Sequence, residues 1–304
     1  MNQGFYRLNT DLISWQTALT MRLAGTGFNA QINMGSASQQ IDGVKSVWYR
    51  RPVMPKAPPS IKEEYASFVE EEWRACLWSL YTTLDAFWVN PPLIGHRLLE
   101  HNKLLQLRTA ASVGFATPNT IITNEATELS TFCECQGGTI VVKTIKGHFF
   151  RRDDREESFV IYTNPVSTDL LNLYKDDIRL APVMAQEYVP KKLELRVTIV
   201  GKQIFACAIH SQESERTKHD WRRYDFEKVK HEPYQLPPEL EKKLLQLMDV
   251  WGLSFGAIDM ILTPDDRYVF LEINPNGQWG WIEQLTGMPI SLAIAELLVN
   301  PPKP

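Results

Sequence analysis

The sequence has little that would place the chain in a membrane or on a secretory route. No apolar run approaches the roughly 18 residues that a membrane-spanning helix needs. The N-terminus MNQGFYRLNT lacks the basic and then apolar segments of a signal peptide. Only four of the 304 residues are cysteine, and their spacing is not that of a zinc site. These absences predict a cytoplasmic protein with reduced thiols and no membrane partner.

Several common functional motifs are also missing. The sequence contains no GxxxxGK[ST], no GxGxxG and no GxSxG, which argues against P-loop, dinucleotide-binding Rossmann and serine-hydrolase proteins. The six histidines show no metal-binding spacing, and a net charge of -4 gives no reason to expect nucleic acid. With 44% hydrophobic and 22% charged residues, the chain is typical of a globular protein of one large or two to three small domains.

The pattern of apolar and turn residues predicts a mixed α/β chain with α+β character. Strands are expected over residues 4–9, 45–50, 120–123, 139–143, 158–163, 183–188, 193–200 and 204–210, with a small sheet between the first two. Helices are expected over 96–113, 125–134 and 237–251, with Asn124 capping the second. A further helix is expected from Ser60, where Ser60-x-x-Glu63 fits a capping box, to about Leu84.

The segment GAIDMILTPDDRYVFLEINPN (256–276) predicts a hairpin that binds a cation. Counting outward from a turn centred on Asp265-Asp266 places Asp259 opposite Glu272, with Asn274 on the same face. Two opposed acids repel unless a cation lies between them, and Mg²⁺ prefers carboxylate and carbonyl oxygens. A solvated polar face is the alternative. The same register predicts a core face made of Ile258, Met260, Leu262, Val269, Leu271 and Ile273, with Phe270 on the other face.

Three lysines lie where they could meet an anion. Lys143 ends the apolar strand predicted over 139–143, and Lys146 follows in a loop whose backbone N–H groups could approach phosphates. Lys103 lies in the first turn of a predicted helix, where positive charge is disfavoured unless an anion is close. Ordinary lysines at element ends are the alternative.

Residues 186–196 are predicted to form a strand, a turn and a second strand. The Gln186-Glu187-Tyr188-Val189 segment enters the turn, where backbone donors and acceptors can bind the edge of an adenine. Glu194 and Arg196 are two residues apart, so they share a face and suit a ribose hydroxyl and a phosphate. A structural ion pair is the alternative.

The polar segment Ser211–Arg223 (SQESERTKHDWRR) is predicted to be a long loop with four cationic side chains. Phosphoryl transfer needs positive groups around the moving phosphoryl, and Arg222 is the candidate in this loop. A solvated charged loop is the alternative.

The order and spacing of these residues resemble the ATP-grasp superfamily, and LEINPNGQWGWIEQLTGMPI resembles its RimK-like branch. More narrowly, SVWYRRP (46–52), AIHSQESERTKHDWRRYD (208–225) and NGQWGWIEQLTGMPI resemble the graspetide synthetases, the microviridin-type peptide maturases. The resemblance implies an ATP-grasp fold with an N-terminal pre-ATP-grasp domain (1–95), a central domain that forms the ATP lid and contacts a leader peptide (96–182) and a C-terminal domain with the metal site (183–304), with ATP held between the last two.

The resemblance also implies an activity, in which ATP and Mg²⁺, with two ions expected, activate Asp or Glu side chains of a precursor peptide for capture by Ser/Thr hydroxyls or Lys amines. The implied partners are the leader and core of that peptide and a second copy of the chain. The implied ATP-binding residues are Lys103, Lys143, Lys146, Gln186, Glu187, Tyr188, Val189 and Glu194. The implied metal ligands are Asp259, Glu272 and Asn274, and the implied catalytic residues are Arg196 and Arg222.

Two other functions fit the same motifs. A RimK-like ligase that joins amino acids or adds glutamates to a protein tail would share the ATP site, and a non-catalytic nucleotide-binding protein would keep only its binding residues. The chain departs from the family at its start, because FYRLNTD resembles the second strand of the usual first domain. An abbreviated or trimmed N-terminal unit is therefore expected.

Overall fold

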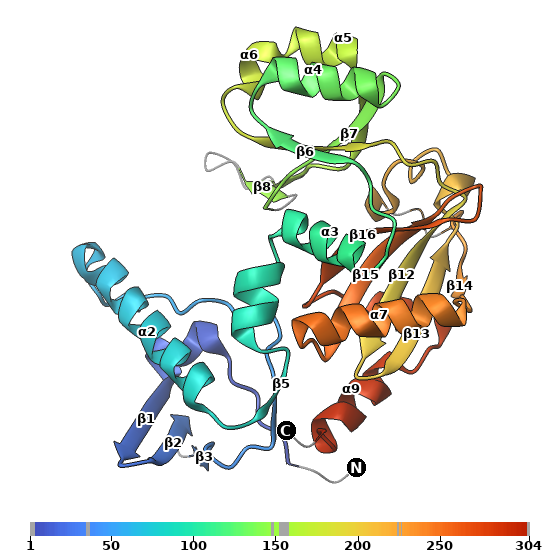
Figure 1. Cartoon of the computed structure of the whole chain (residues 1–304). Coiled ribbons are helices and arrows are strands. Elements are labelled where there is room, and N and C mark those ends of the chain that lie inside the picture. Colours follow the sequence, from blue (N-terminus) through green and yellow to red (C-terminus); the bar gives the residue numbers. More distant parts are fainter. Residues whose placement is uncertain are drawn as a thin grey trace. The chain divides into compact units, whose positions relative to one another are not determined.

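A computed structural model describes residues 4–34, 37–146, 149–151, 158–223, 225 and 227–302 (Figure 1). The chain forms two compact units, one of residues 1–92 with 292–304 and one of residues 93–291. No helix in the described part of the chain is long and apolar enough to cross a bilayer. The predicted division into three domains remains a prediction.

The first unit contains two small sheets and one long helix. An antiparallel sheet has the order β1-β2-β3, formed by Thr17–Ala24, Gly27–Met34 and Ala37–Gln40. The parallel pair is β4 (Ser46–Trp48) with β5 (Phe87–Val89), and α2 spans Glu63–Thr83. Short helical turns lie at Thr10–Leu12 and Ile13–Gln16. The small sheet before residue 45 is confirmed, whereas the strand predicted over residues 4–9 is wrong.

Both predicted helix caps are wrong. Helix α2 begins at Glu63 after Lys62, without a side-chain cap, because Ser60 lies in a turn closed by the Ile61 N–H and the Pro58 carbonyl. Its start is instead stabilised by two acidic residues in the first turn. Helix α4 (Ala126–Cys135) begins after Glu125 without a side-chain cap, and the Asn124 side chain instead donates to the Arg179 carbonyl at 3.3 Å.

A five-stranded antiparallel sheet forms the centre of the second unit. Its order is β14-β13-β12-β15-β16, formed by His231–Pro233, Gln203–Ile209, Leu193–Val200, Phe255–Leu262 and Tyr268–Asn274. One face packs on α3 (Lys103–Ser112) and α7 (Pro238–Trp251), burying the strand residues Leu195, Val197, Ile199, Ile258 and Phe270. We call the opposite face the ligand face; it carries Glu194, Arg196, Thr198, Asp259, Ile261 and Glu272.

Helix α7 shows why the core lies on one side of this sheet. It has prolines at its start, two acidic residues in its first turn and Gly252 at φ +61° after its last turn. Its buried residues recur at helical spacing: Leu240, Leu244, Leu247, Met248 and Trp251. Truncating the fully buried Leu244 to alanine would cost about 2–5 kcal/mol.

A smaller antiparallel sheet with the order β10-β7-β11-β6 lies in the same unit. Its strands are Asn164–Ser167, Thr139–Lys143, Val183–Glu187 and Thr120–Thr123. Helices α4, α5 (Thr168–Leu173) and α6 (Lys175–Ile178) cover one face of it (Figure 1). Strands β8 (Phe149–Arg151) and β9 (Ser158–Val160) pair antiparallel. Residues 147–148 and 152–157, which follow Lys146 in its predicted loop, lie outside the described residues.

The hairpin of β15 and β16 confirms the predicted pairing at its functional end. Asp259 pairs with Glu272, and Ile258 and Ile273 are buried behind them. The register then shifts between Asp259 and Met260, so that Met260 pairs with Phe270 and Leu271 is the extra residue of a bulge.

That bulge moves three side chains to the opposite face from the one predicted. A one-residue shift inverts the alternation, so Phe270 joins the large core, whereas Val269 and Leu271 pack with Ile261 and Val189. The prediction that Val269 and Leu271 lie in the core and Phe270 on the other face is therefore wrong. Ile261, Val269 and Leu271 thus form an apolar surface on the ligand face beside its carboxylates, which we call the apolar floor.

Candidate active site

Two ion pairs organise the ligand face. Arg196 on β12 lies beside Asp259 on β15, with Nη1 2.8 Å from Oδ1, and its Nη2 donates to the Gln278 carbonyl at 3.2 Å. Lys103 Nζ lies 3.2 Å from Glu272 Oε2. Glu194 pairs with Lys191 and Arg196 with Asp259, so the alternative of an ion pair between Glu194 and Arg196 is not what the structure shows. The structure brings Lys103, Arg196, Asp259 and Glu272 together.

Helix α3 is fixed on the edge strand so that Lys103 meets Glu272. The side chain of Asn102 caps the helix by accepting from the Leu105 N–H, so α3 begins at Lys103, within the helix predicted over 96–113. Lys103 lies in the first turn, as predicted. The buried Gln106 then accepts from the Ile273 N–H at 3.0 Å and donates to the Leu99 carbonyl at 2.7 Å. An edge strand would otherwise leave that buried N–H unpaired.

The charges around Glu272 favour its ionised form. Burial alone would raise the pKa of Glu272, but Lys103, Arg222 and Lys143 lower it to about 2. Burial raises the pKa of Asp259, although Arg196 opposes that shift. Glu272 is therefore a fixed negative charge among cations at neutral pH.

The oxygen atoms here fit a hard cation whose shell is completed by other groups. Asn274 follows Glu272 by two residues, and its Oδ1 accepts from the Asn276 N–H at 2.9 Å, which orients the amide. Within the described ranges, no group of three or more His, Cys, Asp or Glu could hold a metal ion by itself. Two carboxylates and an amide oxygen suit Mg²⁺ when phosphate and water oxygens supply the rest.

Lys143 leaves the smaller sheet and is held by Gln186. Its Nζ donates to Gln186 Oε1 at 2.6 Å, and the Gln186 amide donates to the Thr120 hydroxyl at 2.9 Å. Burial lowers the pKa of Lys143 to about 8, with Glu272 opposing the shift. Gln186 is itself buried, so it orients this ammonium.

Binding of ADP should take up protons near pH 8. Free Lys143 is about half protonated there, and adjacent phosphates would raise its pKa, so roughly half a proton should be bound per ADP. Below pH 7 the uptake should fade, and above pH 8 the affinity for ADP should fall. Titration calorimetry in buffers of different ionisation enthalpy measures the uptake. Lys143→Arg, which stays protonated, should abolish it; unchanged uptake in that variant would contradict the assignment.

The segment from 187 to 194 contributes three things to the ligand face: backbone polar groups, the apolar side chain of Val189 and the carboxylate of Glu194. The Glu187 side chain accepts from Asn119 Nδ2 at 2.8 Å and is thereby occupied, so an adenine would meet backbone groups here. Val189 packs on the apolar floor. Glu194 Oε2 is buried and has no hydrogen-bond partner among the described residues, which fits a ribose hydroxyl as donor. Lys146 is exposed.

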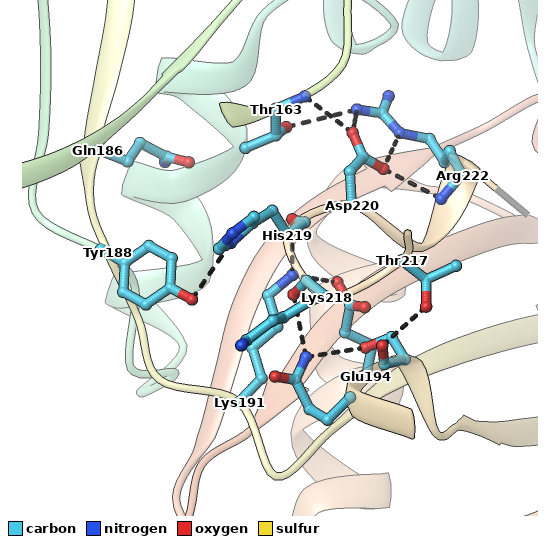
Figure 2. A network of polar contacts seen from close by, with 12 residues as sticks. Thr163, Gln186, Tyr188, Lys191, Glu194, Thr217, Lys218, His219, Asp220 and Arg222 are labelled. Atoms are coloured by element: carbon cyan, nitrogen blue, oxygen red, sulfur yellow. Dashed lines mark hydrogen bonds and ion pairs between the residues drawn. The ribbon is translucent and has the colours of Figure 1, made fainter. Parts of the chain in front are cut away.

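The polar loop 211–223 is packed rather than solvated (Figure 2). Asp220 receives hydrogen bonds from Arg222 through Nε at 2.8 Å and Nη2 at 2.6 Å, and from the Thr163 N–H at 2.9 Å. These contacts lower the pKa of Asp220 to about 2 although burial opposes the shift. Arg222 is thus held in a fixed orientation.

Sequence reasoning missed the packing of this loop. Its buried polar residues recur at every third position: Ser211, Ser214, Thr217 and Asp220. That spacing of small polar residues between charged ones was the available signal, because a chain of tight turns presents every third side chain to one side.

Comparison with known proteins gives the family. Residues 1–94 match the family described as the MvdD pre-ATP-grasp domain, and residues 100–298 match the RimK-like ATP-grasp domain. The chain belongs to the RimK-like ATP-grasp family. No curated protein matches the RimK-like chain in sequence.

Three solved structures resemble this RimK-like protein over nearly its whole length. A RiPP-associated ATP-grasp ligase of Chryseobacterium gregarium, in complex with ADP and a leader and core peptide, is 30% identical, with a TM-score of 0.89 and coverage of 98% of this chain and 89% of that chain. The macrocyclase MdnC of Microcystis aeruginosa MRC, bound with precursor peptide MdnA, is 34% identical, with a TM-score of 0.83 and coverage of 97% and 90%. The macrocyclase MdnB of the same organism is 32% identical, with a TM-score of 0.77 and coverage of 97% and 90%.

These similarities confirm the predicted fold class and the resemblance to graspetide synthetases. The protein is an ATP-grasp ligase with an N-terminal pre-ATP-grasp domain. The roles of the individual site residues in binding ATP and Mg²⁺ and in catalysis remain predictions.

The turn after the hairpin of β15 and β16 in the RimK-like ligase has room only for glycine at 277. A Cβ there would lie 2.2 Å from Ala257 Cβ and 3.0 Å from Arg196 Nη2. Gly277→Ala should therefore destabilise the ligase by about 1–3 kcal/mol or more, displacing Arg196 from Asp259. Gly280→Ala is the matched control, since nothing lies within 4 Å of a Cβ there. Equal melting temperatures for the two variants would contradict this account.

Proposed function

We propose that this ligase macrocyclises a ribosomal precursor peptide by activating its Asp or Glu side chains. The observation that carries the proposal is the cluster on the ligand face, where Lys103, Lys143 and Arg222 surround Glu272 and Arg196 pairs with Asp259. A cluster of positive groups beside two carboxylates suits phosphoryl transfer from a metal-bound nucleotide. The relatives that carry peptides in their structures support a peptide as acceptor.

The residues of the chain have separate roles in this proposal. Lys103, Lys143 and Lys146 would bind the phosphates, the backbone of 186–189 the adenine, and Glu194 the ribose. Asp259, Glu272 and Asn274 would hold Mg²⁺, and two ions are expected. When bound, Mg²⁺ would supply positive charge beside the phosphates. Arg196 and Arg222 would stabilise the charge of the transferring phosphoryl group.

The chemistry has two balanced steps. A carboxylate oxygen of the precursor attacks the γ-phosphorus of ATP, the bond to the β-phosphate oxygen breaks, and ADP leaves with an acyl phosphate formed. A Ser/Thr hydroxyl or a Lys amine then attacks the acyl carbon, phosphate leaves, and the nucleophile gives up its proton. An ester or an amide closes the ring, and each bond makes the product lighter by one water.

The precursor would bind through both a leader and a core. The proposed leader contact lies in the central domain near 148–180, part of which falls outside the described residues. We further propose that the ligase is a homodimer that acts in the cytoplasm.

Intact-mass spectrometry tests the proposed reaction. The ligase is incubated with ATP, Mg²⁺ and a short precursor peptide that carries Ser, Thr or Lys together with Asp or Glu side chains. Loss of one water per bond, dependent on ATP, is expected. A peptide of unchanged mass after incubation with the ligase, ATP and Mg²⁺ would count against cyclisation.

A RimK-like ligase that adds amino acids to a peptide is the second candidate, because the family match covers residues 100–298. It would use the same ATP site. The same experiment separates the two functions, since addition of amino acids increases the mass of the acceptor and cyclisation decreases it.

A further inference from the structure

Lys191 connects Glu194, the proposed ribose-binding residue of the ligand face, to the polar loop 211–223. Its Nζ donates to Glu194 Oε1 at 2.7 Å and to the His219 carbonyl at 2.9 Å (Figure 2). The Lys191 and Glu194 side chains are only 9% and 7% exposed. Burying an ammonium group is favourable only where acceptors surround it. Loss of either contact would therefore leave a buried charge with fewer partners and destabilise this region.

The acceptor at one end of this bridge is prepared for a ligand. Glu194 uses Oε1 for Lys191, while Oε2 is buried without a partner among the described residues. A hydroxyl that donated to Oε2 would fix the carboxylate and, through it, the ammonium of Lys191. Burial raises the pKa of Glu194 and Lys191 opposes that shift, so the two groups depend on each other.

The other end of the bridge leads directly to Arg222. His219 precedes Asp220, which binds both the Arg222 guanidinium and the Thr163 N–H. Within the loop, the Thr217 hydroxyl donates to the Ser211 carbonyl at 2.7 Å. The loop is therefore internally tied, and a displacement at His219 would move Arg222 with it.

A second contact runs in parallel but is weaker. The Tyr188 hydroxyl lies 3.4 Å from His219 Nδ1, with the two rings edge to face at 5.9 Å. A bond at that distance contributes less than the charged bridge. The Ser211 hydroxyl at the start of the loop also hydrogen-bonds to the Glu194 carboxylate, so Lys191 and Ser211 both connect Glu194 to the loop. Of these two, Lys191 reaches the His219 carbonyl next to Asp220.

We propose that Lys191 is a positioning residue that couples nucleotide binding at Glu194 to the order of the Arg222 loop, an inference that rests on the proposed function. A ligase coupled in this way holds its arginine more firmly beside the phosphates when a nucleotide is bound. Lys191 acts through Glu194 and His219 and touches no reacting atom.

Amide hydrogen exchange with saturating ADP and Mg²⁺ tests the coupling in the full chain. In the wild type, ADP should slow exchange several-fold in peptides covering both the 187–190 turn and the 211–223 loop. In Lys191→Met, ADP should still protect the turn but no longer the loop. Lys191→Arg, which can donate to both acceptors, should restore loop protection. Lys192→Met is the matched control, because Lys192 pairs with the exposed Asp266 at 2.7 Å, and it should behave like the wild type.

The two protected regions separate the possible failures. Full loop protection in Lys191→Met at saturating ADP would overturn the coupling and leave Lys191 as a counter-ion of Glu194. Protection of the turn without the loop in the wild type would overturn it as well. If ADP protected neither region in the wild type, the nucleotide site of the proposed function would fail together with the inference. Should Lys191→Met not fold, Lys191→Gln takes its place in the same measurement, and full loop protection in that variant would overturn the coupling.

Discussion

Replacing Glu272 by glutamine should reduce ATP-dependent turnover by about 10³-fold while the chain stays folded. The substitution keeps the size of the side chain but removes the negative charge that faces Lys103, Arg222 and Lys143. It also removes a charged oxygen from the proposed Mg²⁺ ligands. The measurement is ADP release per enzyme in the presence of precursor, ATP and Mg²⁺, together with the Mg²⁺ dependence of ADP binding.

The same hairpin supplies the control for this substitution. Asp265 lies in the exposed turn, where it pairs with Arg267 at 2.7 Å, so Asp265→Asn should leave turnover unchanged. Turnover of Glu272→Gln close to that of Asp265→Asn would contradict the metal assignment.

Replacing Arg222 by methionine should reduce turnover by about 10²–10³-fold with little change in ADP affinity. The guanidinium is held by Asp220 and contributes to the low pKa of Glu272, so it lies close enough to act on phosphate charge. A group that acts mainly in the transition state changes kcat more than the binding of nucleotide. Single-turnover ADP formation and calorimetry with ADP measure the two effects separately.

Arg216 provides the comparison for Arg222, because it is an exposed cation of the same loop. Arg216→Met should keep wild-type turnover. Asp220→Asn should fall between the two, since an amide can still accept one hydrogen bond but cannot hold the guanidinium with two charged oxygens. A loss in Arg222→Met that appears wholly as weaker ADP binding would contradict its role in phosphoryl transfer.

The residues that were predictable lie where local chemistry determines the backbone. Asn102 caps the helix that carries Lys103, so the place of Lys103 in a first turn could be predicted from a few neighbouring residues. The pairing of Asp259 with Glu272 was also predicted correctly, although the turn alone does not set it. Leu262 pairs with Tyr268, one residue away from the predicted register, and the bulge at Leu271 restores that register at Asp259.

The features that were missed depend on partners far away in the chain. The bulge at Leu271 lets Phe270 pack against Phe115, with ring centroids 5.8 Å apart, and that contact is invisible in the hairpin sequence. The alternative of an ion pair between Glu194 and Arg196 was decided in the same way, because Arg196 pairs with Asp259, which lies 63 residues away. The burial of Asp220 likewise required Thr163, which lies 57 residues away.

The central claim is that the ligand face transfers phosphate to a carboxylate of the precursor. It is tested most directly with a precursor whose Asp and Glu carboxylates carry ¹⁸O, by mass analysis of the inorganic phosphate released on cyclisation. The account predicts that each phosphate carries one ¹⁸O atom, because the carboxylate oxygen leaves with the phosphoryl group. Phosphate free of ¹⁸O, released while rings form, would contradict it.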